Sequence, residues 1–160
     1  MNILKIAAAI SAVTLPNFSL AVECDEYHDL ALNIYFEARG ETEDGMQLVG
    51  EVTLNRVESR SFPDNICDVV WQRRQFSWTH DGKSDVPQNQ EKWEIAREIA
   101  ENLINGEIEY FNNGATHFIN PDIVSRIPNW TKAYQELGRV GGHVFYADGS
   151  PRDVIYMAEN

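Results

Sequence analysis

The segment from residue 27 to 41 constrains the fold of this chain more than any other. Its apolar side chains recur every three or four residues, the pattern of a helix with one face in a core: Tyr27, Leu30, Ala31, Ile34, Tyr35 and Ala38. Gly40 is a typical helix stop, so we expect a helix from about Asp25 to Arg39. Glu37 falls in the last turn, where the helix dipole disfavours negative charge, and Glu41 follows the glycine. A carboxylate at this unfavourable position indicates a purpose other than stability.

Glu37 stands out by its neighbours. The chain has 25 acidic residues, and most must be solvated surface groups because charged side chains are rarely buried. Tyr35 and Phe36 precede Glu37, and Arg39 follows it. This apolar and cationic setting can remove a carboxyl group from water and hold it in place, as proteins do with catalytic acids. Glu37 is therefore the first candidate for a catalytic residue, and Glu41 is the second.

The length and charge of the chain limit its partners. With 160 residues, 43% of them hydrophobic, it has the size and composition of one globular domain. A net charge of −12 argues against nucleic acid and against attachment to anionic lipid, because both need a basic surface. We expect a monomer with no stable membrane partner, acting on an uncharged or mixed-charge polymer or a small neutral ligand.

The first 21 residues have the layout of a secretory signal. Lys5 supplies a positive charge, residues 6–15 are uncharged and mostly apolar, Pro16 breaks the run, and residues 19–21 offer small side chains to a peptidase. The apolar run is shorter than the roughly 20 residues of a transmembrane helix, although a releasable anchor is an alternative. We expect residues 1–21 to be a signal peptide, residues 22–160 to be the working domain, and that domain to be exported.

The two cysteines, Cys24 and Cys67, are 43 positions apart. In an oxidising compartment a pair of cysteines in a small domain more often forms a disulfide than stays free. A closed loop of this length can stabilise the fold by roughly 2–4 kcal/mol. Neither cysteine has the spacing of a metal ligand or a neighbour that would make it a nucleophile, so both are expected to be structural.

The rest of the chain predicts an α+β fold that is mostly helical, with a small C-terminal β element. Further helices are expected at 43–59, at 64–71 with Asp64 or Asn65 as cap, and at 89–105 between Asn89 and Gly106. Residues 75–90 are polar and rich in turn formers, so they indicate a long loop, which is often functional. Two β-prone, glycine-bounded segments follow, at 115–119 and 140–146.

The head of the long loop, residues 75–79, is a candidate carbohydrate subsite. Phe76 and Trp78 can stack on sugar rings, and Ser77 and Thr79 can bond sugar hydroxyls. Trp130 is a second aromatic candidate. The alternative is that these aromatic side chains only fasten the loop to the core, their usual role.

The histidines give weak support to a metal site. His117 and His143 lie in separate glycine-flanked segments, and no His-x-x-x-His or His-Glu-x-x-His spacing occurs, so we expect no metal and no cofactor. Spacing alone leaves open that distant ligands converge. The chain also lacks the Gly-x-Ser-x-Gly elbow of serine hydrolases and a phosphate-binding loop. An acid beside an aromatic, hydroxyl-rich groove suits glycosidic bond cleavage, with Glu41 as a possible second carboxylate.

Six motifs in this order resemble the cell-wall hydrolase family that includes the spore-cortex-lytic enzymes. They span most of the chain after residue 25: Ala31–Glu41, Glu51–Val57, Phe62–Trp71, Gln75–Thr79, Gly114–His117 and Gly142–Tyr146. The resemblance implies a compact fold related to lysozyme-like lytic transglycosylases, located in the periplasm or the extracellular cell-wall space. It implies peptidoglycan glycan strands as substrate, cut between N-acetylmuramic acid and N-acetylglucosamine.

The resemblance also assigns roles to residues. It makes Glu37 the single catalytic acid and base, which yields an anhydro sugar, and it leaves Glu41 as a positioning residue. The groove candidates are the aromatic, hydroxyl and cationic side chains near the motifs: Tyr35, Arg39, Phe76, Ser77, Trp78, Thr79, His117 and Trp130. The chain departs from the family where a second histidine often follows His117, because it has Phe118, Ile119 and Asn120 there.

Two other functions stay open at this point. One is a zinc-dependent N-acetylmuramoyl-L-alanine amidase, which would use His117 and His143. The other is a glycan-binding protein without catalysis. The sequence does not decide whether the reaction is hydrolysis or transglycosylation. It also does not decide whether the protein remodels the wall of its own bacterium or lyses a host for a phage.

Overall fold

The computed structural model describes residues 23–111 and 114–149, so the predicted signal peptide at 1–21 lies outside the described residues. The first helix, α1, spans Glu26–Ala38. It begins at Asp25, whose carboxylate accepts a hydrogen bond from the backbone N–H of His28 at 3.0 Å. The predicted apolar stripe is buried except at Tyr27, which is 46% exposed. The first turn therefore lies at the edge of the core.

The other helices also follow their capping residues. Helix α2 spans Glu43–Val57 and ends two residues before the predicted boundary. A short α3 spans Ile66–Val70 with Asn65 as its cap. Helix α4 spans Gln90–Asn105 between the predicted cap Asn89 and Gly106, which adopts the left-handed conformation (φ 67°). Within the expected long loop, residues Ser77–His80 form a 3₁₀ helix.

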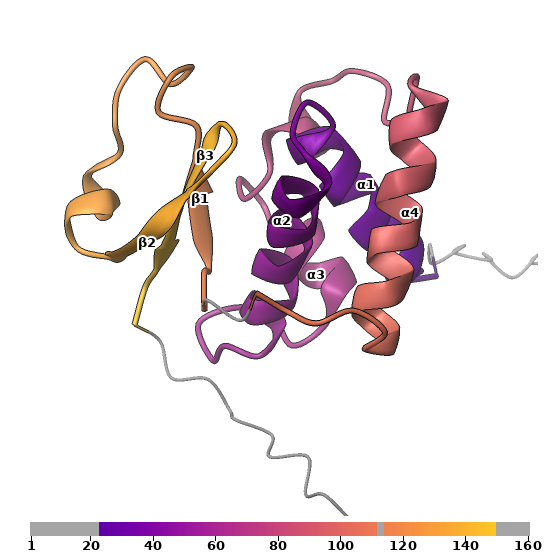
Figure 1. Cartoon of the computed structure of the whole chain (residues 1–160), viewed down its shortest axis with the longest axis horizontal. Coiled ribbons are helices and arrows are strands. Elements are labelled where there is room, and N and C mark those ends of the chain that lie inside the picture. The colour runs from indigo at the N-terminus through magenta and orange to yellow at the C-terminus, as the bar shows by residue number, and fades with distance from the viewer. Residues whose placement is uncertain (1–22, 112–113, 150–160) are drawn as a thin grey trace, which may run out of the picture.

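Helix α1 is the centre of the helical body (Figure 1). It packs against α4, α2 and α3. Gly50 permits the close approach of α2 to its neighbours, because a Cβ atom there would lie 2.6 Å from Leu103 Cδ1 and 2.9 Å from Ile34 Cδ1. Glu37, the predicted acid, thus belongs to the central helix of the helical body.

A three-stranded antiparallel sheet stands beside the helices (Figure 1), with the strand order β1-β3-β2. Its strands are His117–Ile119, Gln135–Val140 and His143–Ala147, in chain order. The predicted β-prone segments form β1 and β3, whereas the sequence did not indicate β2. A second 3₁₀ helix, Asn129–Lys132, lies next to β2.

The two faces of the sheet differ. His117 pairs with Tyr146 and Ile119 pairs with Val144, so these four side chains share one face. They form the outer face of the sheet, against Trp130 and Tyr134. Phe145 lies on the other face and joins the main core of the helical body. The sheet is therefore attached to the helices by its inner face.

Cys24 and Cys67 form the expected disulfide, with their Cα atoms 6.0 Å apart. It joins the chain just before α1 to α3. The α+β, mostly helical fold with a small C-terminal sheet is confirmed. None of the helices in the described part of the chain has the length and apolar character that crossing a membrane requires.

Candidate active site

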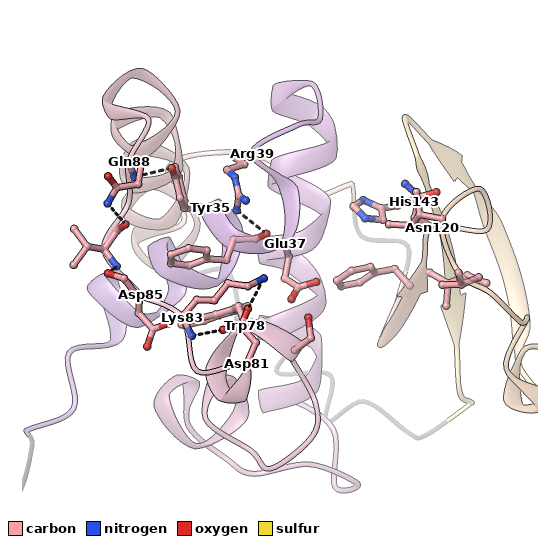
Figure 2. Close-up of a pocket in the computed structure, with 18 residues that line it drawn as sticks. Tyr35, Glu37, Arg39, Trp78, Asp81, Lys83, Asp85, Gln88, Asn120 and His143 are labelled. Carbon is pink, nitrogen blue, oxygen red and sulfur yellow. Dashed lines mark hydrogen bonds and ion pairs between the residues drawn. The ribbon is translucent and has the colours of Figure 1, made fainter.

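A groove of about 660 Å³ runs between the helical body and the sheet. Figure 2 shows the Glu37 carboxylate in this groove, with Tyr35, Arg39 and the loop side chains to one side and His143 and Asn120 to the other. Its lining comes from α1, from residues 77–88 and from the sheet side: Tyr35, Phe36, Glu37, Arg39, Ser77, Trp78, Asp81, Lys83, Ser84, Asp85, Val86, Gln88, Phe118, Ile119, Asn120, Ile123, Val124 and His143.

Glu37 has the electrostatic properties of a general acid. It is partly buried in the last turn of α1. Burial raises the pKa of its carboxyl from 4.5 to about 7, and the positive charges of Arg56 and Arg39 oppose this effect without cancelling it. A large fraction of Glu37 is therefore protonated at neutral pH, where it can donate a proton to a leaving oxygen.

Arg56 is a buried cation behind the site that the motifs did not single out. Its residue is 4% exposed, and its Nε donates to the carbonyl oxygen of Thr116 at 2.7 Å. The guanidinium lies 5.1 Å from the ring centre of Phe62 and 5.0 Å from that of Phe76. Burial lowers the pKa of Arg56 to about 10, so it stays charged at neutral pH and favours the ionised form of Glu37 after proton transfer.

Trp78 forms part of the groove wall and is fixed from behind. Its ring stacks on Phe36, with the ring centres 4.9 Å apart. Its indole N–H donates to Asn33 Oδ1 at 3.1 Å, and Asn33 Nδ2 donates to Thr53 Oγ1 at 3.0 Å. Because Trp78 is only 6% exposed, it offers little surface to the groove and no open stacking platform.

Tyr35 and Arg39 also lie at the groove, in roles set by the loop beside them. The Tyr35 hydroxyl oxygen accepts hydrogen bonds from the backbone N–H groups of Gln88 and Asn89, at 2.9 and 2.8 Å. It therefore holds the end of the segment 81–88, which forms one rim of the groove. The Arg39 guanidinium lies 5.3 Å from the ring centre of Tyr35 and donates to the Phe36 carbonyl at 3.2 Å.

The opposite wall comes from the sheet side and was largely missed. Phe118, Asn120 and His143 line it. The sequence pointed to His143 only as a possible zinc ligand. The period-two alternation of β1 and β3 is the signal that could have placed Phe118 opposite Glu37, but it needs the pairing register, which the sequence does not show.

Glu41 does not line the groove but supports its sheet wall. Its Oε2 accepts a hydrogen bond from the backbone N–H of Gly142 at 2.9 Å, across 101 positions of sequence. A Cβ atom on Gly141 would collide with the same carboxylate. The predicted positioning role of Glu41 therefore has a physical basis, since it joins the start of α2 to the turn between β2 and β3.

Four predicted groove residues lie elsewhere. Phe76 is buried in the core beneath Arg56, and the Thr79 hydroxyl donates to the Phe76 carbonyl at 2.9 Å. His117 and Trp130 lie on the outer face of the sheet, with ring centres 5.1 Å apart. Burial and the nearby charge of Arg56 lower the pKa of His117 to about 4, so it is neutral there. Of the predicted binding residues, Tyr35, Arg39, Ser77 and Trp78 reach the groove.

The sheet register bears on the zinc hypothesis. His143 is an odd number of residues from both Val144 and Tyr146, the two β3 residues that share a face with His117, so the two histidines point to opposite faces. They do not converge on one metal site. Within 23–111 and 114–149, no three histidine, cysteine, aspartate or glutamate side chains gather as metal ligands would.

Comparison with known proteins gives similar sequences and similar structures. The chain is 33% identical over 116 residues to the spore cortex-lytic enzyme of Halalkalibacterium halodurans, and 32% identical to that of Bacillus subtilis. Each match covers 72% of this chain, but 33% and 35% of the respective relatives. The chain thus spans about a third of the length of these relatives.

Two solved catalytic domains share the fold. The catalytic domain of the Bacillus cereus SleB protein matches with a TM-score of 0.63 and 30% identity, covering 76% of this chain and 88% of that domain. The catalytic domain of the germination-specific lytic transglycosylase SleB from Bacillus anthracis matches with a TM-score of 0.65 and 29% identity, covering 82% and 99%. The lysozyme-like fold that the sequence resemblance implied is confirmed.

A family model completes the comparison. The cell wall hydrolase model matches residues 40–146, about two thirds of the chain, and begins three residues after Glu37. It includes both β segments and the sheet side of the groove. The chain belongs to the cell wall hydrolase family.

Proposed function

We propose that this protein cleaves the glycan strands of peptidoglycan between N-acetylmuramic acid and N-acetylglucosamine as a lytic transglycosylase, with Glu37 as the general acid. The observation that carries the proposal is the Glu37 carboxyl, which is partly buried in a groove of about 660 Å³ and has its pKa raised to about 7. Family membership and the solved lytic transglycosylase support the reaction class.

In the proposed reaction Glu37 gives its proton to the oxygen that links the two sugars. The C1–O bond of the muramic residue breaks, and positive charge develops on C1 and the ring oxygen. The C6 hydroxyl of the same sugar then bonds to C1, loses its proton, and leaves a 1,6-anhydro end. No water enters the product, and in the simplest version the Glu37 carboxylate takes the hydroxyl proton.

An exported location fits this substrate. The layout of residues 1–21 supports it, and so does the Cys24–Cys67 disulfide, because disulfides persist mainly in oxidising compartments. We propose that the domain acts on the wall from the periplasm or the extracellular space, as a monomer and without a metal.

The test is the Glu37→Gln variant on purified sacculi. The amide keeps the size of the side chain but has no acidic proton, so we expect turbidity loss to stop while circular dichroism shows an unchanged fold. Glu98→Gln is the matched control, since it makes the same substitution at an exposed position on α4 and should clear sacculi at the wild-type rate.

Mass spectrometry of the wild-type products identifies the bond. Anhydro-muramic ends are expected. Hydrated reducing ends would mean hydrolysis, free stem peptides would mean an amidase, and unchanged sacculi that still bind the protein would mean glycan binding alone. Full activity of Glu37→Gln would overturn the assignment of the acid.

A further inference from the structure

We propose that His143 is the second proton-transfer group of this site, the base that takes the proton of the attacking hydroxyl, and that Glu41 is the positioning residue that orients it. This inference rests on the proposed function and replaces Glu37 in the second half of the reaction. It assigns a catalytic role to the sheet side of the groove, which otherwise only closes the site.

The first support is the place of His143. It begins β3 and lines the groove, and Figure 2 shows its side chain on the sheet side, across the groove from the Glu37 carboxylate. Its side chain is 8% exposed, and the rings of Phe118 and Phe145 lie 5.0 and 6.2 Å from its ring centre. The imidazole is therefore held by packing, and a sugar bound between the walls would have Glu37 on one side and His143 on the other.

The second support is the contact with Glu41. The Nδ1 atom of His143 lies 3.9 Å from Glu41 Oε1. Among the described residues this buried nitrogen has no hydrogen-bond partner. A buried N–H without a partner is costly, and Glu41 Oε1 is an acceptor 3.9 Å away, so an approach of less than 1 Å would form the bond. Catalytic hydrogen bonds are often long before substrate binds and tighten afterwards.

A hydrogen bond from Nδ1 to Glu41 would decide which ring nitrogen is available as a base. When Nδ1–H points at the Glu41 carboxylate, the proton of the neutral ring is on Nδ1 and Nε2 has a free lone pair. The two nitrogens lie on opposite sides of the ring, so Nε2 is directed away from Glu41. The other carboxylate oxygen of Glu41 is held by the backbone N–H of Gly142 at 2.9 Å, which keeps the carboxylate in place. A carboxylate that orients an imidazole in this way is the usual support of a histidine base.

Burial, rather than the charges around it, keeps His143 neutral at the working pH. Burial lowers the pKa of His143, and the Glu41 carboxylate opposes this. Nearby, Lys92 of α4 donates to the Glu41 carbonyl at 3.3 Å, and Arg139 of β2 donates to the Gly141 carbonyl at 3.0 Å while it pairs with Asp122. Around neutral pH the two walls thus carry a protonated carboxyl and an unprotonated imidazole, the pair that acid–base catalysis requires.

The balanced step is as follows. The Glu37 proton goes to the leaving oxygen as the C1–O bond breaks. The C6 oxygen bonds to C1, and its proton goes to His143 Nε2, which gives an imidazolium beside the Glu41 carboxylate. The imidazolium then loses a proton to solvent and the Glu37 carboxylate gains one, so the enzyme returns to its starting state and no water is consumed.

The test is the pH profile of the rate at which anhydro-muropeptides are released from sacculi at low substrate. For the wild-type chain we expect a bell-shaped pH–rate profile. The rate falls above about pH 7 as Glu37 ionises, and it falls again below pH 6.5 as His143 is protonated. In His143→Gln we expect the rate to fall by about 10²–10⁴-fold and the acid limb to disappear.

The variant Glu41→Gln separates the role of Glu41 in orienting His143 from its role in supporting the turn between β2 and β3. The amide oxygen can still accept from Gly142, so the turn keeps its support, but the charge that raises the pKa of His143 is gone. We expect the acid limb to move to lower pH and the maximum rate to fall. Glu98→Gln, which removes a distant exposed charge, should leave both limbs in place.

The outcomes distinguish the two proposals. An unchanged acid limb in folded His143→Gln and in Glu41→Gln would overturn the role of His143 and leave that of Glu37 intact. If His143→Gln does not fold, the limb shift in Glu41→Gln decides alone. An active Glu37→Gln would overturn the proposed acid whatever the histidine variants do.

Discussion

At the scale of single residues, the usefulness of Glu37 and its cost to the fold have one origin. The site removes the carboxyl from water, which keeps it protonated near pH 7 and makes ionisation unfavourable. A raised pKa in the folded state means that the native chain binds this proton when the unfolded chain has lost it. The free energy of unfolding then decreases as the pH rises from about 4.5 to about 7.

This linkage predicts that Glu37→Gln is stabilising at alkaline pH. The amide does not ionise, so the variant escapes the cost of a buried carboxylate. Relative to the wild type, its free energy of unfolding should rise by ~3 kcal/mol between pH 4 and pH 8, because the pKa of Glu37 rises from 4.5 to about 7 on folding. Urea unfolding of both proteins at the two pH values measures the difference. An equal difference in the free energy of unfolding between the two proteins at both pH values would contradict the raised pKa of Glu37.

A second prediction concerns the buried amide behind Trp78. Asn33→Leu should leave the Trp78 indole N–H without its acceptor and lower the free energy of unfolding by about 1–3 kcal/mol. It should also loosen the ring that forms the groove wall, which would appear as a red shift and broadening of tryptophan emission. An unchanged spectrum would mean that stacking on Phe36 alone fixes the ring.

At the scale of elements, the groove rim depends on one phenol oxygen. The Tyr35 hydroxyl accepts from two successive backbone N–H groups, at the end of the 81–88 segment and at the cap of α4. Tyr35→Phe leaves both N–H groups unpaired. We expect a loss of about 1–3 kcal/mol in stability and faster amide exchange in the rim.

Tyr27→Phe is the matched control for this change. It also removes a phenol hydroxyl from α1, but that hydroxyl donates to Asn105 at an exposed position. The expected cost is below about 0.5 kcal/mol. Equal effects of the two variants on amide exchange would contradict a specific role of Tyr35 in holding the rim.

The elements also show where sequence reasoning succeeds. Helices α1 and α4 were predicted to within a residue or two because periodicity, caps and a terminal glycine agree. Strand β2 was missed because its residues are mostly exposed, and its apolar alternation is broken at Gly138 (φ 139°), where the register shifts. A strand stabilised by its neighbour rather than by its own pattern leaves little local signal.

The candidate site likewise has one part that the sequence could predict and one part that it could not. Tyr35, Glu37 and Arg39 lie within one short motif, so the sequence could place them together. Asn120 and His143 come from segments more than 80 positions away and meet Glu37 only through the packing of the sheet on the helices. Likewise, His117 seemed a groove residue until the strand register placed it on the outer face.

At the scale of the whole molecule, the disulfide should affect stability more than activity. Replacing both cysteines, as Cys24→Ser with Cys67→Ser, should lower the free energy of unfolding by about 2–4 kcal/mol, because the unfolded chain regains its freedom. Neither cysteine lines the groove, so the rate per folded molecule at 25 °C should stay within about twofold. Urea unfolding and sacculus clearance measure the two effects, and a large loss of rate in the folded variant would contradict their separation.

The turn between β2 and β3 has a consequence for how such chains can diverge. Besides the Gly141 contact, a Cβ atom on Gly142 would lie 2.5 Å from Asn120 Nδ2 and 2.8 Å from Glu41 Oε1. Three sequence positions that are far apart therefore share one small volume. A relative with a larger residue in place of Gly142 must have moved or shortened one of the other two side chains. Positions 41, 120 and 142 should consequently covary during evolution, although no two of them are neighbours in the chain.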